Sequence, residues 1–277
     1  MTVYNVMINS EIEKSLQTRD FGQNLVCLET TGSTNFDAKK AAANGCDHGY
    51  TVVSDEQTAG RGRLDHEWMS PAGINIYVSI VLRPRVAASC FPQIPVVCAI
   101  ALHKALAEMV PAVELALKWP NDLLAIHNKR KISGILCEGV TMKDRSLAVV
   151  TGVGINVNSS LEDFPEYLRA TATSLKMETG KKWNRERVLA AFLNSFETTF
   201  NEWEAAGGTL RPFMDYWNCH DLLSGQTITI EQGPQIEEGV ASGIDDEGRL
   251  LLETPIGMKL IHAGDVHLHA AYGGMKA

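Results

Sequence analysis

Apolar and polar positions alternate along the first part of the chain in a pattern that predicts strands separated by helices. Alternation with a period of two, together with β-branched residues, predicts strands over residues 23–31, 50–57 and 74–82. After the first of these, the polar cluster Gly32 to Asn35 caps an Ala- and Lys-rich helix that runs to about Gly45. Ser33 and Thr34 are therefore expected at a corner where a strand meets a helix.

The middle of the chain predicts a buried helix, a hairpin and a long amphipathic helix. Apolar spacing with small residues predicts the buried helix from Ile94 to Val110. The runs 115–126 and 130–140 are interpreted as two strands joined by a polar turn. A helix with one apolar face is expected from Arg185 to about Ala205. Mixed strands and helices of this kind indicate an α/β (α+β) fold.

The pattern changes after Leu222, where short strand-like runs alternate with turns. These runs are residues 227–231, 239–244, 249–254 and 258–263. Closely spaced short strands are typical of a small β-barrel of roughly fifty residues. We therefore predict two domains, residues 1–220 and residues 221–277.

Composition and charge narrow the classes of function. The 277-residue chain has a formal net charge of −8 and no dense run of Lys or Arg, which disfavours nucleic acid as a partner. Its six cysteines show no paired C-x-x-C spacing, so neither a zinc cage nor a redox motif is indicated. No export signal and no run approaching the roughly eighteen apolar residues of a membrane helix is evident. We expect a cytoplasmic protein without membrane attachment.

The first candidate site is a glycine- and arginine-rich loop, Gly60-Arg61-Gly62-Arg63, followed by Trp68. Glycine lets the backbone approach an anion closely, and guanidinium groups supply permanent charge and planar donors for phosphate or carboxylate oxygens. Such a loop suits a phosphorylated ligand. A solvated arginine turn is the alternative, and the loop alone does not exclude it.

The second candidate combines Lys118 to Asp122 with Arg130 to Gly134 across the predicted hairpin. Joining a carboxylate to the α-phosphate of ATP requires that the repulsion between two anions be neutralised, which buried Lys and Arg with Mg²⁺ can do. Taken alone, Lys118 and Asp122 could equally be an exposed ion pair.

A third region, Gly152 to Asn158, contains two glycines but no dinucleotide fingerprint. Val157 stands where the third glycine of G-x-G-x-x-G belongs, and no helix pattern follows directly. A close-packed strand remains the simple interpretation, with Asn156 left to contact a ligand.

The order and spacing of these motifs resemble the biotin–protein ligases over nearly the whole chain. Gly-Arg-Gly-Arg, then Lys-Trp-Pro-Asn-Asp, then Lys-Ile-Ser-Gly is jointly a specific combination. The resemblance implies a mixed sheet flanked by helices, like the catalytic fold of class II aminoacyl-tRNA synthetases, with a C-terminal SH3-like β-barrel. It implies ATP-dependent ligation of biotin to a lysine of a biotin carboxyl carrier protein through biotinyl-5′-AMP, with release of pyrophosphate and AMP. ATP and biotin would be substrates, assisted by Mg²⁺, with no metal site in the chain itself.

The resemblance also implies a role for each candidate residue. Ser33, Thr34 and Gln57 would contact the ureido ring of biotin, whose neutral head both donates and accepts hydrogen bonds. The catalytic group would be Lys131, Arg63, Asp122 and Lys118, with Lys131 bridging the biotin carboxylate and the α-phosphate and Asp122 orienting or deprotonating the acceptor amine. Arg61 and Arg63 would belong to a mobile loop that orders over biotin and the adenylate. The other binding residues would be Gly60 in the same motif, Trp68 near the adenine, Asn121 and Asn156 at the nucleotide, Lys131, and Gly134 in the motif after it.

This sequence departs from the family pattern at two places. Many members continue the arginine loop as Gly-Arg-x-Trp, whereas Asp65-His66-Glu67 precede Trp68 here. His66 is therefore either a substitute for a family arginine or a solvated loop residue. Only 32 residues precede Ser33, which predicts a ligase-only form without a DNA-binding domain. His267 and His269 lie two apart and are interpreted as surface or packing histidines, not as a metal site.

Three other functions compete with biotin ligation at this point. A lipoate ligase or octanoyl transferase would share a related fold and similar acceptor domains. A non-catalytic sensor of biotin or its adenylate would bind ligand without forming product. A transcriptional repressor would need a DNA-binding segment that the sequence does not show. The sequence does not fix the oligomeric state, with a homodimer among the options.

Overall fold

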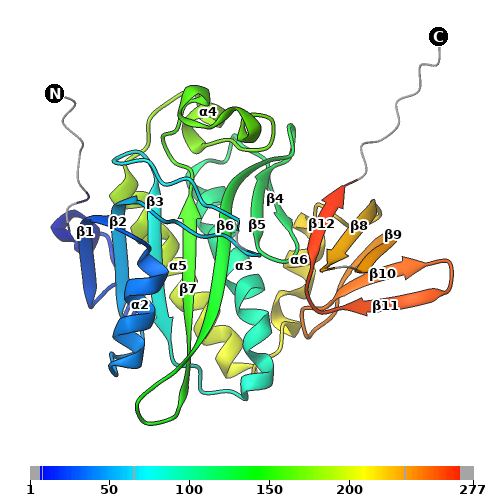
Figure 1. Ribbon diagram of the computed structural model, residues 1–277, viewed down its shortest axis with the longest axis horizontal. Coiled ribbons are helices and arrows are strands. Elements are labelled where there is room, and N and C mark those ends of the chain that lie inside the picture. The colour runs from blue at the N-terminus through cyan, green and yellow to red at the C-terminus, as the bar shows by residue number, and fades with distance from the viewer. Residues whose placement is uncertain (1–6, 8, 65, 234, 269–277) are drawn as a thin grey trace.

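The chain folds around two β-sheets, a large mixed sheet and a smaller antiparallel sheet beside it. The computed structural model describes residue 7 and residues 9–64, 66–233 and 235–268. The larger sheet occupies most of the molecule, and the smaller sheet lies at one side of it, next to the strand β4 (Figure 1).

The large sheet has seven strands in the order β1-β2-β3-β7-β6-β5-β4. β1 and β2 are parallel, and every other neighbouring pair is antiparallel, so the sheet is mixed, as predicted. Its strands are β1 (Leu25–Thr31), β2 (Thr51–Gln57), β3 (Ile76–Leu82), β4 (Leu115–Lys118), β5 (Asp122–Ala125), β6 (Arg130–Thr141) and β7 (Leu147–Ile155).

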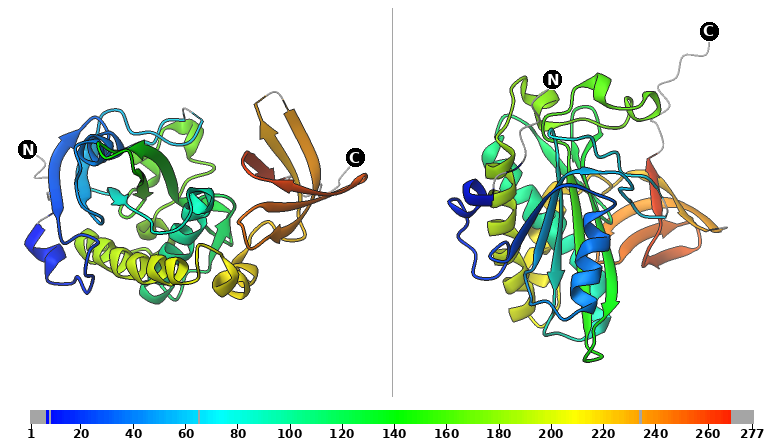
Figure 2. Two further views of the ribbon diagram at one scale, coloured as in Figure 1. Left: turned by 90° about the horizontal axis from the view of Figure 1, so that it is seen from below. Right: turned by 60° about the vertical axis from the view of Figure 1, so that its left-hand side comes forward.

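Helices cover both faces of this sheet. α2 packs on β2, β3 and β7 from one side, whereas α3 packs on β4, β5 and β6 and is itself covered by α5 on the other side (Figure 2). The α-helices are α1 (Asn9–Glu13), α2 (Thr34–Ala43), α3 (Ile94–Met109), α4 (Leu175–Thr179), α5 (Arg185–Ala205) and α6 (Met214–His220). Short 3₁₀ helices are η1 (Ala88–Gln93), η2 (Leu161–Asp163), η3 (Glu166–Leu168) and η4 (Arg211–Phe213).

The most apolar helix of the protein, α3, lies in the hydrophobic core. Together, η1 and α3 form an apolar segment, Ala88–Met109, long enough to cross a membrane by length and composition alone. In the structure 67% of an 18-residue window within it is buried, between the sheet and the apolar face of α5, where Phe196 and Phe200 are fully buried. Burial on both sides explains its continuous hydrophobicity, because a core helix needs no polar face.

The C-terminal sheet has five antiparallel strands in the order β11-β10-β9-β8-β12. These are β8 (Thr227–Gln232), β9 (Gln235–Ile244), β10 (Leu250–Thr254), β11 (Gly257–Ile261) and β12 (Asp265–Leu268). The prediction of a strand-rich C-terminal region is confirmed, but the prediction of a closed barrel is wrong. Among the described residues no pairing joins the edge strands β11 and β12, so this sheet is open.

The predicted strand 115–126 is in fact two strands. Leu115–Lys118 and Asp122–Ala125 pair with each other around a tight turn at Trp119-Pro120-Asn121, whose Trp119–Pro120 peptide is cis. A proline cannot donate a ladder hydrogen bond, which ends β4 at this point. The turn places Lys118 and Asp122 directly opposite each other.

Candidate functional site

A cavity of about 610 Å³ lies between the loops at one end of the large sheet and the start of β12. Its walls come from the start of α2, the end of β2, the arginine loop (residues 59–68), the β4–β5 turn, β6, β7 and β12. It gathers nearly all of the residues singled out from the sequence: Ser33, Thr34, Gln57, Arg61, Arg63, Trp68, Lys118, Asn121, Asp122, Lys131, Gly134 and Asn156. Segments more than a hundred residues apart in sequence therefore form one site.

A polar group lies where α2 begins. The Thr34 backbone N–H donates to Gln57 Oε1 at 2.9 Å, and Gln57 Nε2 donates to Ser70 Oγ at 2.9 Å. Ser33 is the N-cap residue of α2 with an extended backbone, as the sequence predicted. These bonds fix the Gln57 amide with its oxygen toward α2, so the polar end of the cavity has a defined arrangement of donors and acceptors.

Trp68 lies over a glycine patch on the sheet. Gly134 on β6 and Gly154 on β7 are paired in register, and a Cβ atom on Gly154 would overlap the Trp68 indole. At Gly134 a Cβ would come within 3.0 Å of both Trp68 Cζ3 and Lys131 Nζ. The two glycines are thus needed because a large ring lies where side chains would otherwise project.

A group of cations and one acid lies beside this ring. Lys131 Nζ is 2.7 Å from Asp122 Oδ1 and 5.4 Å from the centre of the Trp68 ring. Lys118 is close to both, and its burial, with a smaller contribution from Lys131, lowers the pKa of its amine below the ordinary value, although Asp122 opposes the shift. The alternative of an exposed Lys118–Asp122 pair is wrong, because Asp122 pairs with Lys131 across the hairpin.

Arg63 reaches the same cavity from the arginine loop. It donates from Nη1 to Asn121 Oδ1 at 3.2 Å and from Nη2 to the Gly264 carbonyl at 3.3 Å. Asn121 is held in turn by its donation to the Ile135 carbonyl at 2.7 Å. Arg63 Nη1 is also 3.9 Å from Asp265 Oδ1, so β12 of the C-terminal sheet contributes to the wall of the site.

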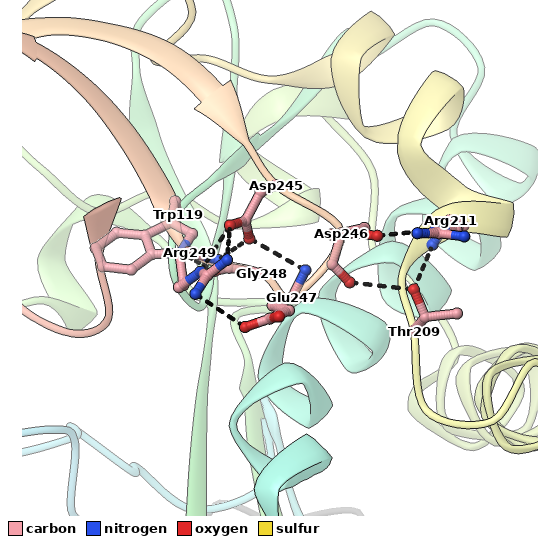
Figure 3. A network of polar contacts seen from close by, with 8 residues as sticks. All are labelled: Trp119, Thr209, Arg211, Asp245, Asp246, Glu247, Gly248 and Arg249. Atoms are coloured by element: carbon pink, nitrogen blue, oxygen red, sulfur yellow. Dashed lines mark hydrogen bonds and ion pairs between the residues drawn. The ribbon is translucent and has the colours of Figure 1, made fainter. Parts of the chain in front are cut away.

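Trp119, which does not line the cavity, connects the β4–β5 turn to the C-terminal sheet. Its indole N–H donates to the Gly248 carbonyl at 2.9 Å, in the turn between β9 and β10 (Figure 3). The same turn is cross-linked by Arg249 to Asp245 and by Arg211 to Asp246. The hairpin that carries Lys118 and Asp122 is therefore buttressed by both sheets.

Some expectations for individual residues need correction or completion. Gly60 does not line the cavity; a Cβ there would meet Ser70 Oγ at 2.7 Å, so it is a packing position. His66 is mostly exposed, and its Nε2 lies 3.5 Å from Asp265 Oδ2. His267 is exposed and 3.7 Å from Glu231, whereas Asp65 and His269 lie outside the described residues.

Asn35 and Asp265 are two of the cavity residues that were not assigned a role from the sequence. Asn35 follows Thr34 in the polar cluster and is 6% exposed, with its side chain over Gly152. Its position next to Thr34 was a signal that could have been used. Asp265 has no local signal, because only the packing of β12 against the arginine loop brings it to the cavity.

Comparison with known proteins shows that the segments forming both sheets match profiles of related ligases. The sequence profile of the biotin/lipoate A/B protein ligase family matches residues 28–156, and that of the biotin protein ligase C-terminal domain matches residues 223–268. The chain is 38% identical over 259 residues to the bifunctional ligase/repressor BirA of Bacillus spizizenii, which covers 94% of this chain and 78% of that protein. It is 36% identical over 243 residues to the biotin--[acetyl-CoA-carboxylase] ligase of Paracoccus denitrificans, covering 86% and 98% of the two chains.

Among solved structures, the chain is similar to the biotin protein ligase of Aquifex aeolicus in complex with biotin and ATP. The TM-score is 0.77 at 30% sequence identity, and the match covers 90% of this chain and 100% of the other. The matched regions of sequence and structure extend from the strands beneath the cavity to the C-terminal sheet.

Proposed function

Because this chain belongs to the biotin protein ligase family, we propose that its cavity joins biotin to ATP as biotinyl-5′-AMP and then transfers the biotinyl group to a lysine of a biotin carboxyl carrier protein. The chain is a ligase, with biotin and ATP as its substrates. The observation that carries the assignment of roles is the convergence of Lys118, Lys131 and Arg63, from three segments, on one cavity that also has a polar end at Thr34 and Gln57.

In the first half-reaction, a biotin carboxylate oxygen attacks the α-phosphorus of ATP. A carboxylate–phosphorus bond forms, the bond from that phosphorus to the bridging oxygen breaks, and pyrophosphate leaves with the electron pair. We assign Lys131 to contact both anions. Lys118 and Arg63 line the same cavity, and fixed cations in a partly buried site would stabilise the charge that develops on phosphorus.

In the second half-reaction, a lysine amine of the acceptor attacks the acyl carbon of the adenylate. The carbon–nitrogen bond forms, the bond to the phosphate oxygen breaks, and AMP leaves. We assign Asp122 to orient the incoming amine, because its carboxylate faces the cavity next to Lys131. An amine with an ordinary pKa near 10.4 must also lose a proton, which Asp122 or solvent would accept.

The other cavity residues are assigned to binding. Ser33, Thr34 and Gln57 would hold the ureido ring of biotin, and Asn121 and Asn156 the nucleotide. Arg61 and Trp68 would cover the adenylate, which hydrolyses in water unless it is enclosed. Gly134 would leave room for Trp68 and Lys131, as its surroundings indicate.

Mg²⁺ would enter with ATP and be held mainly by phosphate oxygens and water, as this ion prefers. Within the described residues, no group of three or more His, Cys, Asp or Glu side chains is placed to hold a metal. We propose no resident metal ion for this chain.

Further parts of the proposal concern the protein as a whole. We propose a cytoplasmic ligase that binds no nucleic acid or membrane, can form a homodimer, and is divided into domains 1–220 and 221–277, the second related to SH3-like barrels. The six cysteines are all free thiols, which suits a reducing compartment.

The test is exchange of labelled pyrophosphate into ATP, followed by transfer to a purified carrier domain. We expect exchange only with biotin present, and labelling of one lysine on the acceptor. Exchange that depends on lipoate and not on biotin would instead support a lipoate ligase. Tight biotin binding without exchange or transfer would support a sensor, and either result would overturn the proposal.

A further inference from the structure

A chain of hydrogen bonds runs beneath the polar end of the cavity and ends at Thr34. Lys39 Nζ on α2 is 2.7 Å from Glu138 Oε1 on β6, and Asn35 Nδ2 donates to Glu138 Oε2 at 2.8 Å. Ser79 Oγ on β3 is 2.6 Å from Asn35 Oδ1 and 2.8 Å from Thr34 Oγ1. Asn35 and Ser79 are buried, 6% and 0% exposed, so water does not substitute for these partners.

The orientation of the Asn35 amide is fixed by its neighbours. Its nitrogen faces two groups that can only accept, the Glu138 carboxylate and the Leu136 carbonyl at 3.3 Å. Although burial opposes the charge on Glu138, the hydrogen bonds from Lys39 and Asn35 lower the pKa of its carboxyl, which therefore stays ionised and accepting at neutral pH. The Asn35 oxygen must then face Ser79.

The direction of each remaining proton follows from this orientation. A hydroxyl has a single hydrogen, and Ser79 must give it to Asn35 Oδ1, because two lone pairs facing each other at 2.6 Å would repel. Ser79 then presents a lone pair to Thr34. On the other side of Thr34, Gln57 Oε1 at 3.1 Å is also an acceptor, because the Gln57 nitrogen donates to Ser70.

The Thr34 hydroxyl thus lies between two acceptors, and its only hydrogen is used inside the protein. Thr34 lines the cavity, so a remaining lone pair of its hydroxyl is left for a ligand donor. An acceptor held in this way binds a ligand N–H and disfavours a ligand that presents only lone pairs or sulfur, because a buried acceptor without a donor is costly.

We propose that Glu138, acting through Asn35 and Ser79, sets Thr34 as a hydrogen-bond acceptor and so selects a ligand ring that carries an N–H. This inference rests on the proposed function, since the ureido ring of biotin supplies that N–H and the dithiolane ring of lipoate does not. Glu138, Asn35 and Ser79 are positioning residues, and Lys39 holds the carboxylate in place.

The polarity of the chain can be tested with Glu138→Gln and with the double variant Lys39→Met with Glu138→Gln. Lysine can only donate, so in the single variant it draws the Gln oxygen toward itself and turns the Gln nitrogen toward Asn35. Asn35 would then flip and reverse the chain. Without the Lys39 amine, the Gln oxygen is free to accept from Asn35 again.

We expect Glu138→Gln to raise the Kd for biotin about tenfold, the effect of one buried hydrogen bond, and the double variant to recover most of that loss. The KM for ATP should stay unchanged in both.

A biotin analogue with both ring N–H groups replaced by oxygen should bind the parental protein about a hundredfold more weakly than biotin, and this ratio should shrink in the single variant. Glu237→Gln, which breaks the equally short Lys259–Glu237 pair on the C-terminal sheet, serves as the matched control.

A double variant weaker than the single one, or a single variant with parental biotin affinity and selectivity, would overturn the inference. A purely structural role for Glu138 predicts that loss of both partners is the more damaging change. If Glu138→Gln fails to fold by circular dichroism, Ser79→Ala takes its place and must lower the ratio between biotin and the analogue. Parental protein that binds no biotin would refute the proposed function itself, a result distinct from unchanged selectivity in the variants.

Discussion

At the scale of single residues, the charge of Lys118 depends on its burial. Burial lowers the pKa of its amine, so it loses its proton at a lower pH than an exposed lysine, whose pKa is about 10.4. The rate constant kcat/KM for ATP reports ionisations of the free enzyme. We expect kcat/KM for ATP to decrease in alkaline solution at a pH below the pKa of an exposed lysine. In Lys118→Arg, which keeps its proton, this decrease should occur at a higher pH.

The measurement is the pH profile of biotin-dependent pyrophosphate exchange for the parental enzyme and the variant. Lys182→Arg, at an exposed position, is the control and should leave the profile unchanged. If Lys118→Arg also keeps the parental alkaline limb, the assignment of that limb to Lys118 is refuted.

Gly154 is required by the position of Trp68. In Gly154→Ala the new methyl group would overlap the indole, so Trp68 must move away from β7 and from Lys131. We expect kcat/KM for adenylate formation to fall by about a hundredfold, because catalysis is sensitive to displacements of about 1 Å. Gly139→Ala on β6, where a Cβ meets nothing within 4 Å, is the matched control and should retain activity. Similar exchange rates for the two variants would count against this role for the Trp68 platform.

Some residues of the site could be recognised from the sequence and others could not. Motifs such as Gly60 to Arg63 and Lys118 to Asp122 combine residue types that rarely serve packing alone, so they could be recognised locally. The role of Asn35 could not, because it depends on Glu138 about a hundred residues later. The need for glycine at position 152 could not be predicted either, because the side chain that lies over it, that of Asn35, belongs to α2.

At the scale of elements, a buried histidine joins α3, α6 and β4. His103 Nε2 lies 3.1 Å from the Leu115 carbonyl and Nδ1 2.7 Å from the Tyr216 hydroxyl. The carbonyl can only accept, so Nε2 carries the hydrogen and Nδ1 accepts from Tyr216. Burial of this neutral ring lowers the pKa of His103 to about 4. The arrangement therefore requires the uncharged form.

This contact predicts that the fold loses stability in mild acid. The unfolded chain takes up the proton at a pKa of about 6.5 while the folded chain resists it, so the contribution is present above pH 6.5 and is lost as the pH falls toward 4. The loss from this group is about 3 kcal/mol over that range.

Urea unfolding at pH 7 and pH 4.5 measures this loss directly. His103→Gln should be less stable at pH 7 but lose less between the two pH values than the parental protein. His262→Gln, at an exposed position, is the control and should lose as much stability between the two pH values as the parental protein. Equal acid losses in His103→Gln and the parental protein would show that His103 does not cause the effect.

Elements were predicted best where the periodicity is continuous. The buried helix near Ile94 and the long helix from Arg185 agree with α3 and α5 to within a few residues. The β4–β5 hairpin was missed because the apolar run on both sides of Trp119-Pro120 looks like one strand, although the proline was the available warning. α6 is short and has only one buried side chain, Trp217, so its pattern carries little signal.

At the scale of the whole molecule, the two sheets meet at the site. The C-terminal sheet supplies Asp265 and the Gly264 carbonyl to the arginine loop, and its β9–β10 turn accepts the Trp119 N–H. We expect Trp119→Phe to lower the free energy of unfolding by about 2 kcal/mol, through the lost hydrogen bond and the smaller ring. It should also lower kcat/KM for ATP about fivefold, because Lys118 is the preceding residue.

Trp183→Phe is the matched control, because its indole N–H bond to Thr179 is also 2.9 Å but the chain neighbours of both residues do not line the cavity. Both variants should lose stability, as followed by urea unfolding, and only Trp119→Phe should lose activity. Equal effects on kcat/KM would show that the contact between the sheets does not support the site.

The arrangement of the two sheets was the part that sequence patterns described least. Strand-like runs after Leu222 predicted the second sheet, but its open form and the approach of β12 to Arg63 depend on contacts between distant segments. The resemblance of the motifs, and not their periodicity, predicted that the large sheet is mixed.

Single-turnover formation of biotinyl-5′-AMP shows whether cations from separate segments join a carboxylate to a phosphate in this cavity. Enzyme in excess over biotin is mixed with ATP, and the adenylate is measured after rapid quenching, in parallel with equilibrium binding of biotin. We predict that Lys131→Ala binds biotin within a few-fold of the parental affinity but forms the adenylate at least about a hundredfold more slowly. Adenylate formation by Lys131→Ala at the parental rate would contradict the account.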